Sequence, residues 1–494
     1  MTTKWVLALM AVMSAACGSA VAQNAAGTVA REYATPRQAE LLKGFQEFVA
    51  IPNVAADPAG LKRNAVWLLA QLQQRGVAAQ LLTAPGLPVA TPPVVYGEIR
   101  TPGATHTFVF YAHYDGQPVT ASEWANGAPF KPEVKTVDGE QRVYGRGTGD
   151  DKAAIFAQLT ALSALQAAKM PLKANIRFIW EGEEENGSLH LEQILDAHKD
   201  IIGGNVWLVC DGPVDQTRQQ LLTFGARGDA HVQITVYGPD RGLHSGHYGN
   251  WAPNPAMMMA QLLARMKDAS GHVMIPHFYD GIKPLGPREI AALKAAPRND
   301  EMLKTDFGIG STMGGGRPLL ELINEPSLEI AGISAGQTGS HATNTIVATA
   351  MANLDLRLVV GIDAGVQQHR VLDYIKSQGY FVTADEPTRE ERLSHAKVAR
   401  VELKEGENAS RTPMDLPIAA EVIETVESAR GKTVLLPTSG GTVPLDAMER
   451  ASGSPTISVP IANHDDNQHA ANENLRLKNL WDGIETMAAL MEMK

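Results

Sequence analysis

At 494 residues, the chain is too long for a single ordinary hydrophobic core, and its length predicts two or three domains. Hydrophobic residues make up 44% of the sequence and charged residues 20%, which is the composition of a soluble globular protein. The formal net charge is −11 and no segment is rich in Lys and Arg, so neither nucleic acid nor an anionic membrane is an expected partner.

The first residues have the pattern of a secretory signal peptide. Lys4 precedes the apolar run Trp5–Met13, and small residues follow it. We predict a signal peptide over residues 1–22, with cleavage before Gln23. The alternatives are a membrane anchor, for which the apolar run is short, and a lipoprotein with its lipid on Cys17. The expected location is periplasmic or secreted, with no membrane span in the mature chain.

Helical and strand-like patterns alternate in the first half of the chain. Such alternation predicts a mostly parallel sheet covered on both faces, with functional side chains just beyond the carboxyl ends of its strands. Cys210 is the only cysteine after the signal peptide, so no internal disulfide is expected, and we predict a buried strand residue there. Helices are predicted over 35–75 and 152–168, and strands over 77–82, 94–99, 107–112, 174–180 and 205–210.

The pattern changes near Gly225 and predicts an inserted domain. Two β-α-β-like halves suggest an α/β sandwich with one helix-covered sheet. The predicted division is a catalytic domain formed by 23–222 and 410–494, with an inserted domain over 223–409. Within the insertion, a stretch rich in Pro and Gly (277–318) lies among strands at 229–237, 327–333, 350–360 and 398–404 and helices at 255–268 and 364–378.

Side chains of the metal-ligand type follow several of the predicted strands. His113 ends one strand, and Asp115, two residues later, shares its face and could orient the imidazole. A glycine-rich turn delivers Asp150 at the start of a helix, and Asp211 follows another strand. The remaining candidates are the acidic run Glu181, Glu183, Glu184 and Glu185, which ends the strand 174–180, and His469 in a C-terminal loop.

Each of these residues also has an ordinary explanation. The glutamates could form a solvated acidic loop, Asp150 could be a helix N-cap, and Asp211 a turn residue. The glycine-rich turn lacks the G-x-x-x-x-G-K-[ST] pattern of a phosphate loop. Taken together, two histidines and three or four carboxylates at strand ends predict a site for a pair of metal ions that catalyse hydrolysis. Zinc is the first candidate for these ions. The lack of thiolate ligands favours a catalytic site over a structural one.

The order of these motifs resembles the co-catalytic zinc aminopeptidase and deacylase family, which includes carnosinase-type dipeptidases, aminoacylases, carboxypeptidase G and desuccinylases. The resemblance implies an α/β fold with a three-layer α/β/α zinc-binding catalytic domain and an inserted α+β, ferredoxin-like lid that mediates homodimerisation. It rests on His-x-Asp at 113–115, Gly-Arg-Gly-x-x-Asp-x-Lys at 145–152, Glu-Gly-x-Glu-Glu-x-Gly-Ser at 181–188, the strand-end Asp211, Leu-His-Ser-Gly at 243–246 and the late His469.

The resemblance also implies two zinc ions per subunit and a set of ligands for each of them. His113 and Asp211 would hold one zinc, and Glu185 and His469 would hold the other. Asp150 would bridge the two ions. Manganese or cobalt could replace zinc at such a site.

Further roles near the metals follow from the same resemblance. Glu184 falls at the general-base position, where it would take the proton of a zinc-bridging water and return it to the leaving amine. Asp115 would steer His113. Glu183 occupies a position where the family pattern tolerates other residues, so we expect it to be dispensable. A cis peptide bond is implied at Asp150–Asp151.

The substrate-binding residues implied by the resemblance lie mainly in the lid. His244 matches the lid histidine that, in dimeric members, reaches the partner's active site. The carnosinase-type branch is the most similar, and there the equivalent of Arg357 binds the substrate's C-terminal carboxylate, a task suited to a guanidinium. Thr345 and Thr442 would make polar contacts. Thr442 stands where that branch has Ser in a Gly-Gly-Ser motif.

Three functions are compatible with these observations. The first is an exported di-zinc dipeptidase or exopeptidase that acts on small peptides, which export favours. The second is an N-acyl-amino-acid deacylase or desuccinylase with the same chemistry. The third is a non-catalytic zinc-binding or peptide-binding protein that keeps the fold, although the proposed base, bridge and ligand positions are all filled.

Overall fold

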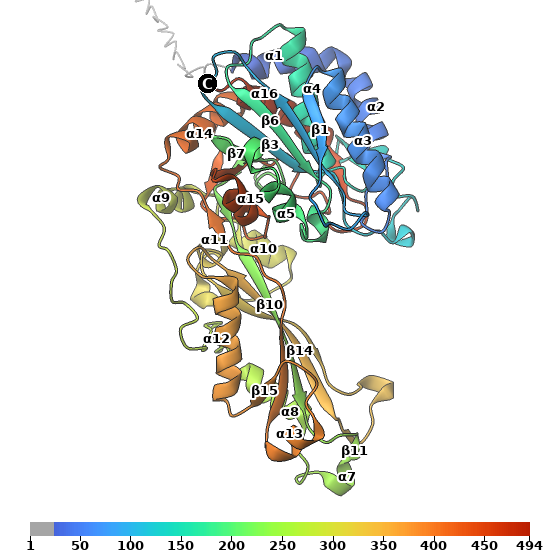
Figure 1. Ribbon diagram of the computed structural model, residues 1–494, viewed down its shortest axis with the longest axis vertical. Coiled ribbons are helices and arrows are strands. Elements are labelled where there is room, and N and C mark those ends of the chain that lie inside the picture. The colour runs from blue at the N-terminus through green and yellow to red at the C-terminus, as the bar shows by residue number, and fades with distance from the viewer. Residues whose placement is uncertain (1–23) are drawn as a thin grey trace, which may run out of the picture.

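The computed structural model describes residues 24–494 and has two parts of different shape (Figure 1). A rounded part contains an eight-stranded sheet with helices around it, and a narrow part with a five-stranded sheet projects from it. We refer to the narrow part as the lid. The predicted signal peptide and Cys17 lie outside the described residues.

The large sheet is mixed. Its centre is parallel, since β3 runs parallel to β6 and β7, and β7 to β19. Antiparallel pairs occur towards the edges, between β1 and β2, β2 and β6, and β19 and β8. Residues 83–93, which join β1 to β2, form no helix, and such a short connection favours antiparallel pairing. In spatial order the strands are β1 (Ala78–Leu82), β2 (Val94–Ile99), β6 (Asn175–Glu181), β3 (Thr107–His113), β7 (Val206–Val209), β19 (Thr456–Ser458), β8 (Leu221–Thr223) and β18 (Val434–Leu436).

Helices cover both faces of this sheet, which confirms the three-layer architecture. Phe108 and Phe110 of β3 pack into the cluster formed with one helical layer, whereas Val109 and Tyr111 pack into the cluster on the other face. Successive side chains of a strand point to opposite faces, so an unbroken apolar strand requires cover on both. The first layer holds α1 (Ala25–Ala34), α2 (Gln38–Val49), α3 (Pro58–Gln74), α4 (Lys152–Ala167), α14 (Pro417–Arg430) and α16 (Leu477–Met491), and the second holds α5 (Leu191–Asp196), α6 (Lys199–Ile202) and α15 (Leu445–Ser452).

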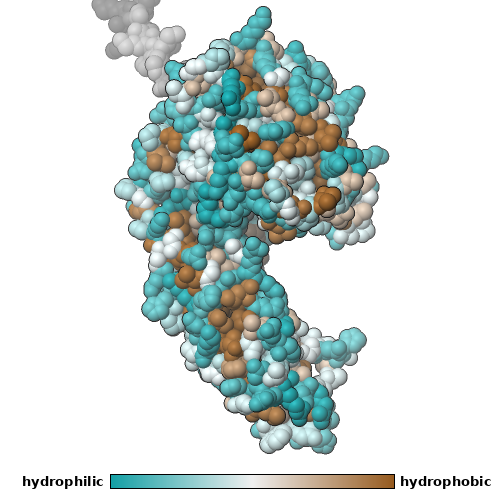
Figure 2. Space-filling view, viewed as in Figure 1, coloured by the Kyte–Doolittle hydropathy of each residue, from teal (hydrophilic) through white to brown (hydrophobic). Residues whose placement is uncertain are grey.

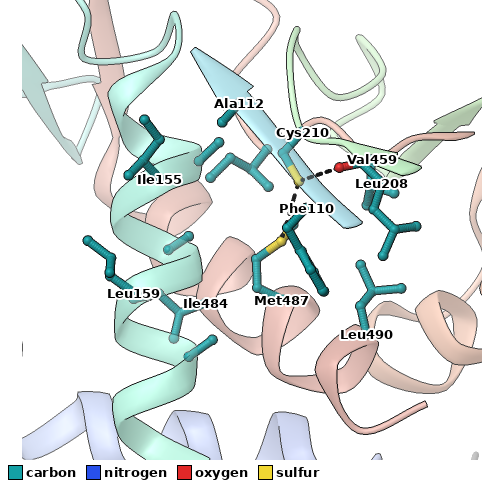
Figure 3. Close-up of a cluster of buried hydrophobic side chains, with 14 of the residues drawn as sticks. Phe110, Ala112, Ile155, Leu159, Leu208, Cys210, Val459, Ile484, Met487 and Leu490 are labelled. Carbon is teal, nitrogen blue, oxygen red and sulfur yellow. Dashed lines mark hydrogen bonds between the residues drawn. The ribbon is translucent and has the colours of Figure 1, made fainter. Parts of the chain in front are cut away.

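Cys210 is fully buried, as predicted, one residue beyond β7. Its sulfur lies 3.6 Å from the sulfur of Met487 on α16, and Figure 3 shows it among apolar side chains that include Phe110 and Ile155. Burial raises the pKa of the Cys210 thiol well above its usual value. The residue therefore acts as a small apolar packing group.

The C-terminal segment returns to the rounded part of the molecule. Its strand β19 lies between β7 and β8, and α16 packs against α4 and α1. A small three-stranded sheet, which the sequence did not predict, joins the C-terminal segment to the first half of the chain. It consists of β20 (Asn474–Arg476), β5 (Glu140–Tyr144) and β4 (Glu133–Val137).

The lid is built on the strand order β12-β14-β10-β16-β15. Ala230, Val232 and Ile234 of β10 are buried, and the side chains between them are only half-buried, because helices cover one face of the sheet. The predicted strands are present, together with the unpredicted β15. The elements are β10 (Gly228–Tyr237), α8 (Pro255–Ala264), β12 (Ser327–Ser334), β14 (Thr349–Leu358), α12 (Ala364–Ser377), β15 (Phe381–Thr383) and β16 (Val398–Leu403).

The stretch 277–318, rich in Pro and Gly, contains helices that were not predicted. These are α9 (Pro287–Ala295) and α10 (Asp300–Asp306), and α11 (Leu319–Leu322) follows them. α9 packs against β18, at the edge of the large sheet. Helices this short show too little apolar periodicity to be detected from sequence. No helix within residues 24–494 is both long and apolar enough to cross a lipid bilayer.

Candidate metal centre

The candidate site lies at the carboxyl end of the large sheet. The neighbouring parallel strands β6, β3 and β7 end there, so the side chains that follow them meet at one edge. His113 ends β3, Asp211 follows β7, and Glu184 and Glu185 follow β6 in a short 3-10 turn. Asp150 reaches the same edge from the loop that precedes α4.

Six side chains singled out in the sequence converge there in two groups of three. Within each group, the possible ligand atoms of the three residues lie within 4.8 Å of one another. Each group offers one imidazole nitrogen and two carboxylate oxygens, which are donor types that zinc accepts, and three protein ligands leave a fourth position for water or substrate. The groups are His113, Glu184 and Asp211, and Asp150, Glu185 and His469.

Asp150 connects the two groups. Its Oδ1 lies 2.9 Å from Nε2 of His113, and its Oδ2 lies 3.2 Å from Nε2 of His469. The two oxygens of one carboxylate therefore face the two imidazoles, which is the arrangement that a bridging ligand requires. The Asp150–Asp151 peptide bond is cis, in agreement with the resemblance.

Asp115 holds both the histidine and the acidic turn. Its Oδ1 lies 3.3 Å from Nδ1 of His113. The backbone N–H groups of Glu184 and Glu185 donate to its two oxygens, at 3.1 Å and 3.0 Å. The second contact was not foreseen, and it means that Asp115 orients one imidazole and two carboxylates together.

Burial and crowding of like charges set the protonation of this site. Burial, supported by the neighbouring carboxylates, raises the pKa of Glu184 well above its usual value against the influence of His113. Burial likewise raises the pKa of Asp211 to about 7. Hydrogen bonds to Asp150 and Glu185 raise the pKa of His469 to about 10. Carboxylates this close repel one another, and bound dications would offset that repulsion, so the residues fit a metal pair.

Two amide side chains that sequence reasoning missed hold the ligand carboxylates. Gln117 donates to Glu185 through its backbone N–H (3.1 Å) and its side-chain amide (2.8 Å). Gln468 donates from Nε2 to Oδ2 of Asp150 at 2.9 Å. A lone glutamine in a loop gives no sequence signal of such a role, because its partners are decided by the fold.

Glu473 anchors the loop that carries Asp150. Its carboxylate accepts hydrogen bonds from the backbone N–H groups of Gly147 (2.9 Å), Gly149 (2.8 Å) and Asp150 (3.1 Å). Arg146 donates to it as well, at 2.8 Å. Both charged side chains are almost fully buried, so this contact fixes the loop to the C-terminal segment.

The other two glutamates of the acidic run lie outside both ligand groups. Glu181 is buried and accepts a hydrogen bond of 2.6 Å from the hydroxyl of Tyr111. Burial raises the pKa of Glu181 to about 8. Glu183 lies 2.8 Å from Nδ1 of His190. These positions agree with a supporting role for Glu181 and no ligand role for Glu183.

A cleft of about 760 Å³ opens beside the candidate metal centre. Asp150, Glu184 and Asp211 line it, and so do Arg357 and Thr442. Arg357 donates from its terminal nitrogen to Oγ1 of Thr442 at 3.0 Å. The structure therefore brings both residues to the cleft, within a volume that suits a small ligand.

Unlike Arg357 and Thr442, the other two predicted substrate-binding residues, His244 and Thr345, do not line the cleft. They pair with each other across the short strands β11 (Leu243–His244) and β13 (Thr345–Ile346). This pair lies at the far end of the lid from the large sheet (Figure 1). Within one chain, neither residue is brought to the candidate metal centre.

The family model for peptidase family M20/M25/M40 matches residues 109–493. The match covers most of the chain and includes every residue of the candidate metal centre. The chain belongs to this family, which confirms the resemblance drawn from its motifs. It is an enzyme of the metallopeptidase class.

Several similar proteins match this chain over nearly its whole length. The beta-Ala-His dipeptidase of Homo sapiens is 26% identical over 485 residues, which are 93% of this chain and 90% of that protein. The Cys-Gly metallodipeptidase of Candida albicans is 26% identical over 477 residues, with 92% and 94% coverage. The structure of an M20 family metallo-carboxypeptidase from Sulfolobus solfataricus superimposes with a TM-score of 0.77 at 25% identity, covering 92% of this chain and 99% of that one.

Proposed function

We propose that the protein is an exported dipeptidase that works with two zinc ions per subunit. The proposal rests on the two ligand groups, which Asp150 connects and one of which includes Glu184 at the lining of the cleft. Two of the similar proteins are dipeptidases by name. The test is hydrolysis of a panel of dipeptides by the chain that begins at Gln23.

The same panel decides between the dipeptidase and its main alternative. N-acetyl and N-succinyl amino acids are included beside the free dipeptides. Release of amino acids from dipeptides supports the proposal. Hydrolysis of the acylated amino acids alone would assign the protein as a deacylase or desuccinylase that uses the same chemistry.

The chemistry follows from the positions of the side chains. When bound, a pair of zinc ions lowers the pKa of water and polarises a carbonyl oxygen. His113, Asp211, Glu185 and His469 would hold the ions, with Asp150 shared. Asp115 keeps the acidic turn in place through two backbone hydrogen bonds.

Glu184 acts as the proton carrier of the reaction. Its carboxylate accepts a proton from the attacking water as the bond from water oxygen to carbonyl carbon forms. It then donates that proton to the amine nitrogen as the carbon–nitrogen bond breaks. The carboxylate of Glu184 lies beside possible ligand atoms of His113 and Asp211, so it can reach a water held at that group.

Replacement of Asp150 by alanine is expected to lower the amount of bound zinc. The wild-type protein, stripped with a chelator and reloaded, should hold two zinc ions per chain, and the variant fewer, because Asp150 contacts both ligand groups. Metal analysis after gel filtration measures this, and it also tests manganese and cobalt. Asp280→Ala is the control, since Asp280 pairs with the exposed His277 and should leave two ions bound. If the wild type and Asp150→Ala bind the same number of zinc ions per chain, the bridging role of Asp150 is contradicted.

Replacement of Arg357 by alanine is expected to raise the KM for dipeptides about 10- to 100-fold, the effect of losing a charged hydrogen bond of roughly 1.5–3 kcal/mol. A dipeptide with an amidated C-terminus should be affected much less, because it lacks the carboxylate that Arg357 would bind. Steady-state kinetics on the two substrates measure the difference. Arg389→Ala, at an exposed lid position, is the matched control. Equal losses on both substrates would rule out carboxylate recognition.

We also infer a homodimer formed through the lid. The edge strand β12 exposes Ile330 and Ile333, at 45% and 59% of their surface, and an apolar edge strand is open to pairing with another copy. A partner's lid would be the source of His244 and Thr345 for the cleft. Sedimentation analysis tests this. A monomer would leave both residues without the proposed role.

Export is proposed from the N-terminal sequence alone. Expression of the full chain in a secretion-competent bacterial host should give a periplasmic or secreted protein whose first residue is Gln23. N-terminal sequencing and mass measurement check this. A mature chain that starts at a lipidated Cys17 would instead identify a lipoprotein.

A further inference from the structure

Apolar side chains line the cleft together with the candidate metal ligands. Leu221 of β8 and Leu436 of β18 contribute from the large sheet. Leu303 of α10, Leu319 of α11 and Ile323 contribute from the helical segment between the two sheets. We call these five residues the apolar wall.

The helical half of this wall is attached to the large sheet. Ala296, at the end of α9, is buried in a cluster with Val434 and Leu436 of β18. Arg288 donates to the carbonyl oxygen of Met414 at 3.1 Å, and the N–H of Met414 donates to Glu289 at 3.2 Å. Leu320 of α11 packs against the same cluster, so this helical segment is in contact with the metal-binding side of the molecule.

Part of the apolar wall is exposed to water. Leu319 leaves 47% of its surface accessible, and Leu303 and Ile323 are only half-buried. Figure 2 shows apolar residues at the surface near the junction of the rounded and narrow parts. Exposed aliphatic side chains that line a cleft mark a ligand-binding surface, because a ligand that covers them removes apolar area from water.

The acidic residues along the cleft do not turn this wall into a site for a cation. Asp300 accepts a hydrogen bond of 2.7 Å from the backbone N–H of Leu319. Asp215 accepts from the backbone N–H and the hydroxyl of Thr217. Asp229 lies 4.0 Å from the guanidinium of Arg357. Each of these carboxylates already has a partner within the chain.

We propose that the apolar wall is a subsite for a large aliphatic or aromatic side chain of the substrate. This inference rests on the proposed function and deepens it, since it names peptides with residues such as leucine or phenylalanine as the substrate class. The scissile amide lies against the metal ligands, and the apolar side chain lies against Leu319 and Ile323. Peptides of glycine alone leave this surface uncovered.

The test compares Gly-Gly, Gly-Leu, Leu-Gly and Gly-Lys as substrates of the zinc-loaded enzyme. The wild type should cleave at least one leucine peptide with a kcat/KM about tenfold or more above that for Gly-Gly, the scale of discrimination typical of apolar pockets. In Leu319→Asp, the loss on that leucine peptide should exceed the loss on Gly-Gly by about tenfold. Ile323→Ala should show the same trend to a smaller extent.

Leu393→Asp is the matched control, because Leu393 is 76% exposed on the lid helix α13 (Arg389–Ser394) and does not line the cleft. It should leave the ratio of leucine to glycine activity as in the wild type. A wild-type preference for Gly-Gly or Gly-Lys would overturn the subsite. Equal losses of Leu319→Asp on all four peptides would overturn it as well.

Failure of the subsite can be told apart from failure of the dipeptidase assignment. If no dipeptide is cleaved but N-acetyl-leucine is cleaved in preference to N-acetyl-glycine, and Leu319→Asp removes that preference, the subsite stands and the dipeptidase proposal falls. Binding is measured independently by calorimetry with free leucine and free glycine. Leucine should bind the wild type more tightly than glycine and lose that advantage in Leu319→Asp, and equal binding of the two amino acids would overturn the subsite.

Discussion

Replacement of Glu184 by glutamine is expected to lower kcat for peptide hydrolysis by about 10²- to 10⁴-fold, the usual contribution of a positioned acid–base group. Glutamine has nearly the same size and keeps the backbone N–H that donates to Asp115, so the acidic turn should stay in place. It cannot take up a proton from water. Steady-state kinetics and zinc analysis on the same preparation measure the effect, and zinc binding should largely persist, with the candidate bridge and the other ligands intact.

Glu183→Gln is the matched control for this substitution. Glu183 is the preceding residue and carries the same side chain, but it pairs with His190 and belongs to neither ligand group. Its replacement should change kcat less than about threefold, a small effect against the loss expected at a catalytic base. Full activity of Glu184→Gln would exclude the proposed base. Complete loss of zinc in that variant would show instead that Glu184 is mainly a ligand, as its place beside His113 and Asp211 also allows.

The second large effect is expected at Glu473. Replacement by glutamine leaves the buried guanidinium of Arg146 without its counter-charge and weakens the hydrogen bonds from Gly147, Gly149 and Asp150. Breaking a buried ion pair in this way costs about 3–5 kcal/mol of unfolding free energy. The midpoint of thermal unfolding of the metal-free protein should fall by roughly 5 °C.

Glu192→Gln provides the comparison for Glu473. Glu192 pairs with Arg450 where both side chains are about half exposed, so its loss should cost about 1 kcal/mol or less. Scanning calorimetry of both variants beside the wild type measures the difference. Similar midpoints for the two variants would contradict the anchoring role of Glu473.

Much of the fold follows from local patterns along the chain. The run Phe108–Ala112 has no polar interruption, and such a strand must be covered on both faces, which the two clusters around β3 confirm. The alternation in β10 predicted a sheet covered on one face, as the lid has. Edge strands and short helices, such as β15 and α9, were not predicted from the sequence because few of their residues are buried in a regular pattern.

The main residues of the candidate site could also be predicted from local patterns in the sequence. His113, Asp150 and Asp211 stand directly after apolar strands or before a helix, and the ends of neighbouring strands meet at one edge of a sheet. Asp115 was predictable as the partner of His113, but the amide side chains that hold two of the ligand carboxylates were not. Gln117 and Gln468 carry no charge and follow no period, so nothing in the sequence marks them as partners of Glu185 and Asp150.

The sequence by itself determined the class of fold, the residues of the candidate metal centre and the family, because each depends on short segments whose periodicity and residue types are local. Tertiary structure alone decided which distant segments meet. Glu473 lies 327 residues from Arg146 in the chain, and α9 lies on the large sheet although the lid elements flank it in sequence. Such contacts depend on strand order and on the path of the loops, which set distances that local patterns do not encode. For the same reason, the sequence could assign both Arg357 and His244 to substrate binding, with His244 reaching a partner's site, but only the fold shows that Arg357 lies at the cleft of its own chain and His244 does not.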